Sequence, residues 1–201
     1  MSSARSRSRN AQASRARILE CATDLFLQRG YEGTSILEVA AQAGYTSGAV
    51  YRHFPSKSLL MVAVVRHALA HLPPVLSADT ERQPLRSIVA LMMTFARADM
   101  RDVRALTIAL NTAPDDSTIR DMQEDFGVSR AEQIGRLIAA GEGDSAVATV
   151  DQKARLVMLI LLGLCHIDGV APELCDSAAM ETMLHGVVTG LFGAGRAPAA
   201  Q

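Results

Sequence analysis

Residues 34–57 read TSILEVAAQAGYTSGAVYRHFPSK, and this stretch predicts two short helices joined by a tight turn. Ser35 and Glu38 form a capping box, in which a hydroxyl and a carboxylate each satisfy a free backbone amide at a helix start. Gly44 follows where the chain must reverse, because glycine adopts a left-handed backbone conformation without steric cost. The apolar stripe of this first helix consists of Ile36, Val39, Ala40 and Ala43.

The second helix of the pair begins with very little side-chain bulk. Thr46 is placed to cap it, and residues 47–49 are serine, glycine and alanine, so that its backbone can approach a ligand closely. Val50 and Phe54 are spaced to pack inward, and Pro55 ends the helix. The side chains left to face a ligand or solvent are Ser47, Tyr51, Arg52 and His53.

A further helix is expected directly after this pair, with Ser56 as its cap and Lys57 in its first turn. The positive end of a helix dipole beside a cation suits a phosphate oxygen. Residues 34–57 therefore predict a DNA-reading helix-turn-helix. The alternative is a helical hairpin inside a core, with Tyr51 and His53 as ordinary amphipathic side chains.

A third helix is predicted before the pair, over residues 14–30, SRARILECATDLFLQRG. Its apolar residues lie on one face, and Gly30 marks its end. Three helices with this spacing can pack into one small domain. The apolar face consists of Ile18, Cys21, Ala22, Leu25 and Phe26.

Residues 14–60 resemble the N-terminal DNA-binding domain of the TetR family of bacterial transcriptional regulators. Two departures are Tyr45, where a small aliphatic residue is usual, and Ser58, where an acidic residue commonly follows the lysine. The resemblance covers about a quarter of the chain. The residues that carry it are Gly30, Tyr31, Thr34, Ala43, Gly44, Gly48, Tyr51, His53, Phe54 and Lys57.

The predicted helix-turn-helix assigns DNA contacts to residues at the surface of this domain. We expect phosphate contacts from Thr34, Ser35, Tyr51, His53 and Lys57, and positions at or near base edges for Ser47, Gly48, Ala49 and Arg52. Thr46 adjoins this surface as the expected cap of the recognition helix, and Tyr45 either fills a groove in the domain or reaches the DNA backbone.

Charge is distributed unevenly along a chain whose formal net charge is −1. Residues 1–57 hold eight Lys or Arg and four Asp or Glu, a balance of +4, so the remainder carries −5. Residues 1–13 are rich in serine and arginine and poor in apolar residues, which predicts a disordered basic arm. Such an arm either neutralises phosphates on DNA or is a solvated tail without a specific role.

The 201 residues allow one small and one medium domain, and 49% apolar residues with few aromatics suit a helical core. The start of the chain has no apolar stretch typical of a secretion signal, and the most apolar run, residues 156–164, is too short to span a bilayer. We therefore expect a cytoplasmic protein without membrane partners. The cysteines, Cys21, Cys165 and Cys175, have no metal-site spacing and are expected to be buried small hydrophobes.

Helical patterns continue over about 84–100, 103–111, 114–140, 151–169 and 176–192, so the expected fold is all-α with about nine helices. The predicted division is a basic arm over 1–13, the helix-turn-helix domain over 14–60, a helical bundle over 61–193 and a flexible tail over 194–201, with the break at Pro73 and Pro74. The helix over 151–169 is apolar nearly all round, which requires cover on two sides.

The resemblance implies the rest of the function: a homodimer joined through helices 151–169 and 176–192, bound to a palindromic operator and, as a repressor, released when a small molecule enters the bundle. Two recognition helices about 34 Å apart meet successive major grooves of one DNA face. No cofactor is expected. Candidate residues for the ligand pocket are Met92, Phe95, Met122, Phe126, Met158 and His166.

The alternative function is a helical-bundle enzyme or metal site that uses Cys165, His166 and Asp168. Adjacent residues on a helix point about 100° apart, so Cys165 and His166 do not readily converge on one atom. The sequence also lacks a glycine-rich phosphate loop and a paired helical metal motif. We therefore expect neither catalysis nor a bound metal.

Overall fold

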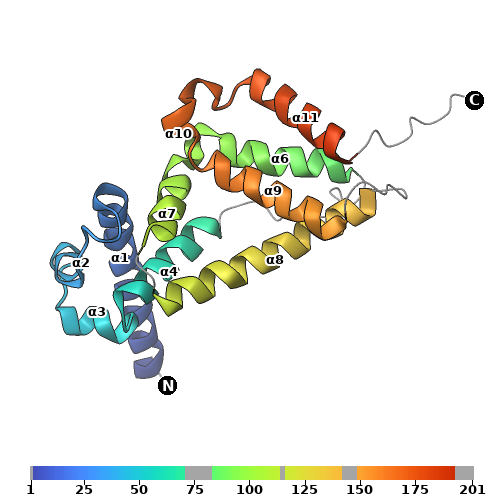
Figure 1. The fold of residues 1–201 in the computed structure, drawn as a ribbon. Coiled ribbons are helices and arrows are strands. Elements are labelled where there is room, and N and C mark those ends of the chain that lie inside the picture. The colour runs from blue at the N-terminus through green and yellow to red at the C-terminus, as the bar shows by residue number, and fades with distance from the viewer. Residues whose placement is uncertain (1, 71–82, 114–115, 142–148, 193–201) are drawn as a thin grey trace, which may run out of the picture. The chain divides into compact units, whose positions relative to one another are not determined.

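The computed structural model describes residues 2–70, 83–113, 116–141 and 149–192 (Figure 1). Within these ranges the fold is all-helical, as predicted, with ten α-helices, two short 3-10 helices and no strand. The chain divides into two compact units, which are described separately here. The first comprises residues 1–71 and 105–122, and the second comprises residues 72–104 and 123–201.

The first unit is built from α1 (Ser2–Arg29), α2 (Ile36–Ala43), α3 (Ser47–His53) and α4 (Lys57–Leu69), together with residues 105–122. α1 packs against α2, α3 and α4, and α2 packs against α3. Phe26, Val39, Val50 and Leu60 are among the side chains that fill the shared core, each less than 4% exposed. Burial of these side chains fixes the short helices α2 and α3 in place.

The prediction of a disordered arm over residues 1–13 differs from the structure, in which α1 begins at Ser2. The low apolar content limits how much surface the segment buries, but it does not prevent a helix that is already nucleated over 14–29 from continuing. Each added residue then contributes one hydrogen bond, and alanine and arginine are good helix formers. The exposed Arg9 consequently stands on a helix.

The second unit contains α6 (Pro84–Ala96), α9 (Val150–Leu164), α10 (Ile167–Val170) and α11 (Ala178–Phe192). Its other elements are the 3-10 helices Ala98–Met100 and Pro172–Leu174, the start of α7 (Arg101–Asn111) and most of α8 (Ser117–Gly141). α6 packs against both α9 and α11, so these three helices form the centre of the unit (Figure 1).

Two of the expected long helices end earlier than predicted. α6 stops at Ala96, and the helix expected over 151–169 stops at Leu164 before the short α10. A buried arginine contacts the chain at the end of α6 and just beyond the end of α9. The Arg104 guanidinium donates to the Phe95 and Arg97 carbonyl oxygens at 2.7 and 2.6 Å, and it forms two hydrogen bonds with the Asp168 carboxylate at 2.8 and 2.7 Å. The turn before α10 therefore presents Asp168 to Arg104.

Several predictions concern residues outside the described ranges: the break at Pro73 and Pro74, the start of a helix at Pro114 and the tail over 194–201. The described helices include none that is both long and apolar enough to cross a membrane.

Candidate nucleic-acid interface

The turn between α2 and α3 has the geometry that its sequence predicts. Ser35 accepts a hydrogen bond from the Glu38 amide, and the Glu38 carboxylate accepts one from the Ser35 amide, so the capping box is confirmed. Gly44 has a φ of 77°, and its N–H donates back to carbonyl oxygens at the end of α2. Thr46 then accepts from the Ala49 amide at 3.3 Å and caps α3.

One face of α3 is open and carries small residues at its start. Gly48 is exposed, and a Cβ added there would meet nothing within 4 Å. Tyr45 and Tyr51 are 39% and 49% exposed, so part of each aromatic side chain is accessible to a ligand. The opposite face is held by the buried Val50. The open face consists of Tyr45, Thr46, Ser47, Gly48, Ala49, Tyr51 and Arg52, and we call it the recognition face.

Thr34 does not belong to this surface, so its expected phosphate contact is corrected. Its side chain is buried, and its single hydroxyl proton is shared between the Gly30 and Leu25 carbonyl oxygens, which lie 2.9 and 3.2 Å from Oγ1. Ser35 is exposed, but both its amide and its hydroxyl donate to the Glu38 carboxylate. These two hydrogen bonds leave Ser35 without a free donor for a phosphate.

Two residues of α1 that the sequence reasoning missed support the end of α3. The Ser14 hydroxyl lies 3.0 Å from His53 Nε2, and the Arg15 guanidinium lies 5.0 Å from the centre of the buried Phe54 ring. His53 is therefore oriented from α1 and is only partly exposed. The helical spacing of Ser14 and Arg15 gave no signal for these contacts, because they join residues about forty positions apart.

Lys57 lies at the first residue of α4, where Ser56 caps the helix by accepting from the Leu59 amide at 3.0 Å. Its ammonium group lies 4.2 Å from the centre of the Tyr31 ring. No carboxylate pairs with Lys57 in the described part of the chain. A cation held by an aromatic face at a helix N-terminus is available to a phosphate.

Ser58, which stands where the family commonly has an acidic residue, is a buried hydrogen-bonding residue at the start of α4. Its side chain is 5% exposed, its hydroxyl donates to the Asp116 carboxylate at 2.5 Å, and Tyr31 donates to it at 3.4 Å. Asp116 also accepts from the Thr118 amide at 2.9 Å and thus holds the first turn of α8. The Ser58 hydrogen bond lowers the pKa of Asp116 below its ordinary value.

The helices of the first unit are similar in sequence to a known family of regulatory proteins. The family model for the bacterial regulatory proteins of the tetR family matches residues 18–64, which contain α2, α3, the start of α4 and most of the apolar face of α1. Residues 18–64 form a TetR-family domain. An HTH-type transcriptional repressor from Mycobacterium tuberculosis is 42% identical over 64 residues, which is 32% of this chain and 34% of the relative. The chain spans about a third to a half of the length of the first curated relatives it matches.

Solved structures extend the likeness in fold beyond the TetR domain. GusR of Salmonella enterica superposes with a TM-score of 0.72 at 21% identity, over 90% of this chain and 95% of GusR. The SmeT–triclosan complex superposes with a TM-score of 0.68 at 23% identity, over 94% of this chain and 99% of SmeT. At these identities the shared property is the all-helical fold.

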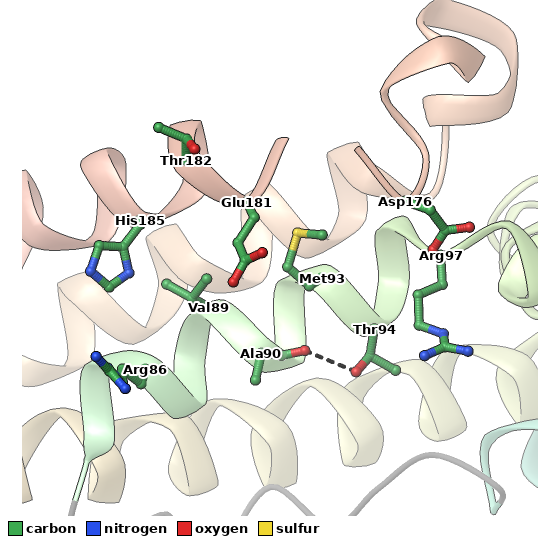
Figure 2. A pocket seen from close by; sticks show the side chains of 10 residues that line it. All are labelled: Arg86, Val89, Ala90, Met93, Thr94, Arg97, Asp176, Glu181, Thr182 and His185. Atoms are coloured by element: carbon green, nitrogen blue, oxygen red, sulfur yellow. Dashed lines mark hydrogen bonds between the residues drawn. The ribbon is translucent and has the colours of Figure 1, made fainter. Parts of the chain in front are cut away.

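The residues expected to line a ligand pocket belong to different elements. Met92 and Phe95 are buried residues of α6, Met122 belongs to the core of the first unit, and His166 is exposed. Phe126 packs against the Arg130 guanidinium at 5.2 Å, and Met158 is partly buried on α9. None of these six residues lines the groove of about 780 Å³ that the second unit presents between α6 and α11 (Figure 2).

The alternative of a catalytic or metal centre at Cys165, His166 and Asp168 finds no support in the geometry. Cys165 is buried, its thiol lies 3.5 Å from the Leu161 carbonyl oxygen, and burial raises its pKa to about 11. Asp168 is engaged by Arg104 and Arg101. The described residues contain no group of three or more His, Cys, Asp or Glu side chains arranged to hold a metal ion.

An apolar stripe is exposed on the two helices expected to form a dimer. On α9 it comprises Leu156, Leu159 and Leu162, of which Leu159 is 64% exposed. On α11 it comprises Met183 and Val187, and a Cβ added at the adjacent Gly186 or Gly190 would meet nothing within 4 Å. We call this surface the α9/α11 stripe. Exposed apolar residues at helical spacing mark a surface that another helix can cover.

Proposed function

We propose that this protein is a transcriptional regulator that binds a palindromic DNA operator as a homodimer. The observation that carries the proposal is the recognition face of α3, which is open, small at its start and flanked by Lys57 at the N-terminus of α4. The TetR-family match over residues 18–64 supports the same function. Repression is favoured over activation by the name of the Mycobacterium tuberculosis relative.

Within this proposal the contacts divide by chemistry. Under this proposal Lys57, Tyr51 and His53 contact phosphates, whereas Ser47, Gly48, Ala49 and Arg52 contact base edges. Tyr45 and Thr46 adjoin the same face. Arg52 is the one long donor among the base-edge residues, so specificity depends also on close van der Waals fit and on DNA shape.

The second unit supplies dimerisation and control. The α9/α11 stripe pairs with its copy in a second chain, which brings two recognition helices to one operator. A small molecule bound in the second unit then favours a state in which α4 and its neighbours hold the two recognition helices at a separation that DNA does not match. SmeT, a protein of similar fold, was solved in complex with triclosan, and this supports a small-molecule site in the proposed regulator. Each tenfold loss of DNA affinity requires about 1.4 kcal/mol of differential ligand binding.

The test is selection from a random duplex library with the purified full chain, followed by the mass of the complex on the recovered duplex. The proposal predicts an enriched palindrome bound by an even number of chains. Failure to enrich any sequence, with the protein folded, would overturn it. Arg52 is then tested on the enriched duplex and on duplexes with single base changes: Arg52→Ala is expected to change the base preference, and Thr23→Ala, on α1 away from the recognition face, serves as the control.

A further inference from the structure

The groove between α6 and α11 lies in the second unit, and none of the six residues predicted to hold a ligand lines it (Figure 2). Its volume of about 780 Å³ falls within the range of small-molecule sites. The α6 residues along it follow helical spacing, with Val89, Ala90 and Met93 forming an apolar strip. Charged side chains from both helices border this strip.

The groove lies on a different side of α11 from the α9/α11 stripe. At 100° per residue, the midpoint between Glu181 and His185 is roughly 160° from the midpoint between Met183 and Val187. The buried side of α11, which includes Leu184 and Val188, faces the core. A second chain that covers the stripe would therefore leave the groove open.

One end of the groove is already satisfied by its own residues. The Arg97 guanidinium forms two hydrogen bonds with Asp99, at 3.0 and 2.7 Å, and the Asp176 carboxylate accepts from the Ala98 amide at 3.1 Å. Asp176 has a φ of 55°, a conformation that non-glycine residues seldom adopt, so this contact holds it in place. Little charge at this end is left for a ligand.

The other end presents charges that have no partner within the described part of the chain. Arg86, Glu181 and His185 form no ion pair or side-chain hydrogen bond there, and Arg86 and Glu181 do not pair with each other. Figure 2 shows His185 on the same side as Arg86, and Glu181 reaching from α11 toward the apolar strip of α6. The site thus offers a cationic end, an anionic point and apolar surface between them.

We propose that this groove binds a zwitterionic ligand with an apolar body, whose anionic group meets Arg86 and whose cationic group meets Glu181. A ligand lying along the strip covers both side chains, and covering a charge without pairing it is costly. A pure anion would leave Glu181 unpaired, and a pure cation would leave Arg86 unpaired.

Three probes with one apolar chain test this assignment by titration calorimetry on the full chain without DNA: 6-aminohexanoate, hexanoate and hexylamine. We expect 6-aminohexanoate to bind at least tenfold more tightly than either singly charged probe. Arg86→Gln is expected to weaken 6-aminohexanoate and hexanoate but not hexylamine, whereas Glu181→Gln weakens 6-aminohexanoate and hexylamine but not hexanoate. Both residues are exposed, so these variants should keep the fold.

Matched controls are Arg155→Gln and Glu132→Gln, which line another groove between α8 and α9 and should leave all three affinities unchanged. The assignment is overturned if 6-aminohexanoate shows no binding at millimolar concentration. It is also overturned if the three probes bind equally, or if the groove variants behave like the controls. Because no DNA is present, each outcome is independent of whether the protein regulates transcription.

Discussion

Single residues in the TetR domain show that a motif position and a surface position are separate properties. Thr34 was expected to contact phosphate from its place in the motif, yet its hydroxyl ties the end of α1 to the start of α2. The sequence could not reveal this, because burial of Thr34 depends on how α1 and α2 pack. By contrast, Ser35, Glu38, Gly44 and Thr46 act on neighbouring backbone, and their capping and turn roles were predicted.

The buried hydroxyl of Thr34 gives the first prediction. Thr34→Val removes the hydroxyl that donates to buried carbonyl oxygens, so we expect the free energy of unfolding to fall by about 1–2 kcal/mol. The DNA affinity of the folded protein should not change, because the side chain is not on the surface. Urea denaturation and a DNA titration at low temperature measure the two quantities. A large loss of DNA affinity at unchanged stability would return Thr34 to the contact set.

Asp168 gives a prediction about pH. The Arg104 hydrogen bonds lower the pKa of Asp168, so its contribution to stability is present above the ordinary carboxyl pKa and is lost as pH falls through the lowered value. Asp168→Asn leaves the fully buried Arg104 without its counter-charge, and we expect a loss of about 3 kcal/mol at pH 7.

The measurement for Asp168 is urea denaturation across a pH series. The difference in stability between wild type and Asp168→Asn should shrink as pH falls below the ordinary carboxyl pKa of about 3.9, because the unfolded chain then takes up a proton at Asp168 before the folded chain does. Asp151→Asn, in an exposed pair with Arg155, is the control and should change little. A difference that stays constant down to the acid range would contradict the assigned role.

At the scale of elements, the helices were largely predictable, but some of their ends and the long-range contacts between them were not. The apolar spacing of α1, α2, α3 and α11 is a local property and gave their positions closely. The helical start of α1 was missed because apolar content predicts packing and not helix propagation. The end of α9 at Leu164 was missed; Asp168, just beyond it, contacts Arg104, which is 64 residues away in the chain, and local spacing does not reveal such a contact.

The contact between Ser58 and Asp116 is such a long-range contact, because it links the start of α4 to the start of α8 within the first unit. Ser58→Asp would place the acidic residue common in the family directly against the Asp116 carboxylate. We expect a loss of stability on the order of 2 kcal/mol from this buried like-charge pair. Adding Asp116→Asn should recover most of the loss, since an amide can donate to the new carboxylate.

Thermal denaturation of the single and double variants measures this coupling. Ser129→Asp, at an exposed position on α8, is the control for adding a carboxylate and should have a small effect. If the loss of stability in the double variant equals the sum of the losses in Ser58→Asp and Asp116→Asn, the two residues do not act together.

At the scale of the whole molecule, the proposed assembly depends on the α9/α11 stripe. Leu159→Glu puts a charge in the centre of this apolar surface, so we expect a dimer of the wild type to dissociate to monomers. Val170→Glu is the matched control, because Val170 is 82% exposed and lies on α10 outside the stripe. Sedimentation velocity at micromolar concentration distinguishes the two forms. A dimer that survives Leu159→Glu would place the interface elsewhere.

The proposal that Lys57 and α3 lie on DNA is tested most directly by titrating the library-selected duplex with wild type and with Lys57→Gln at several salt concentrations. Two Lys57 side chains per dimer should each account for nearly one released counterion. The variant should therefore bind more weakly on selected and scrambled duplexes alike, and its dependence on log salt concentration should be shallower by about two. Binding that is unchanged in affinity and salt slope would contradict the placement of Lys57 and α3 on DNA.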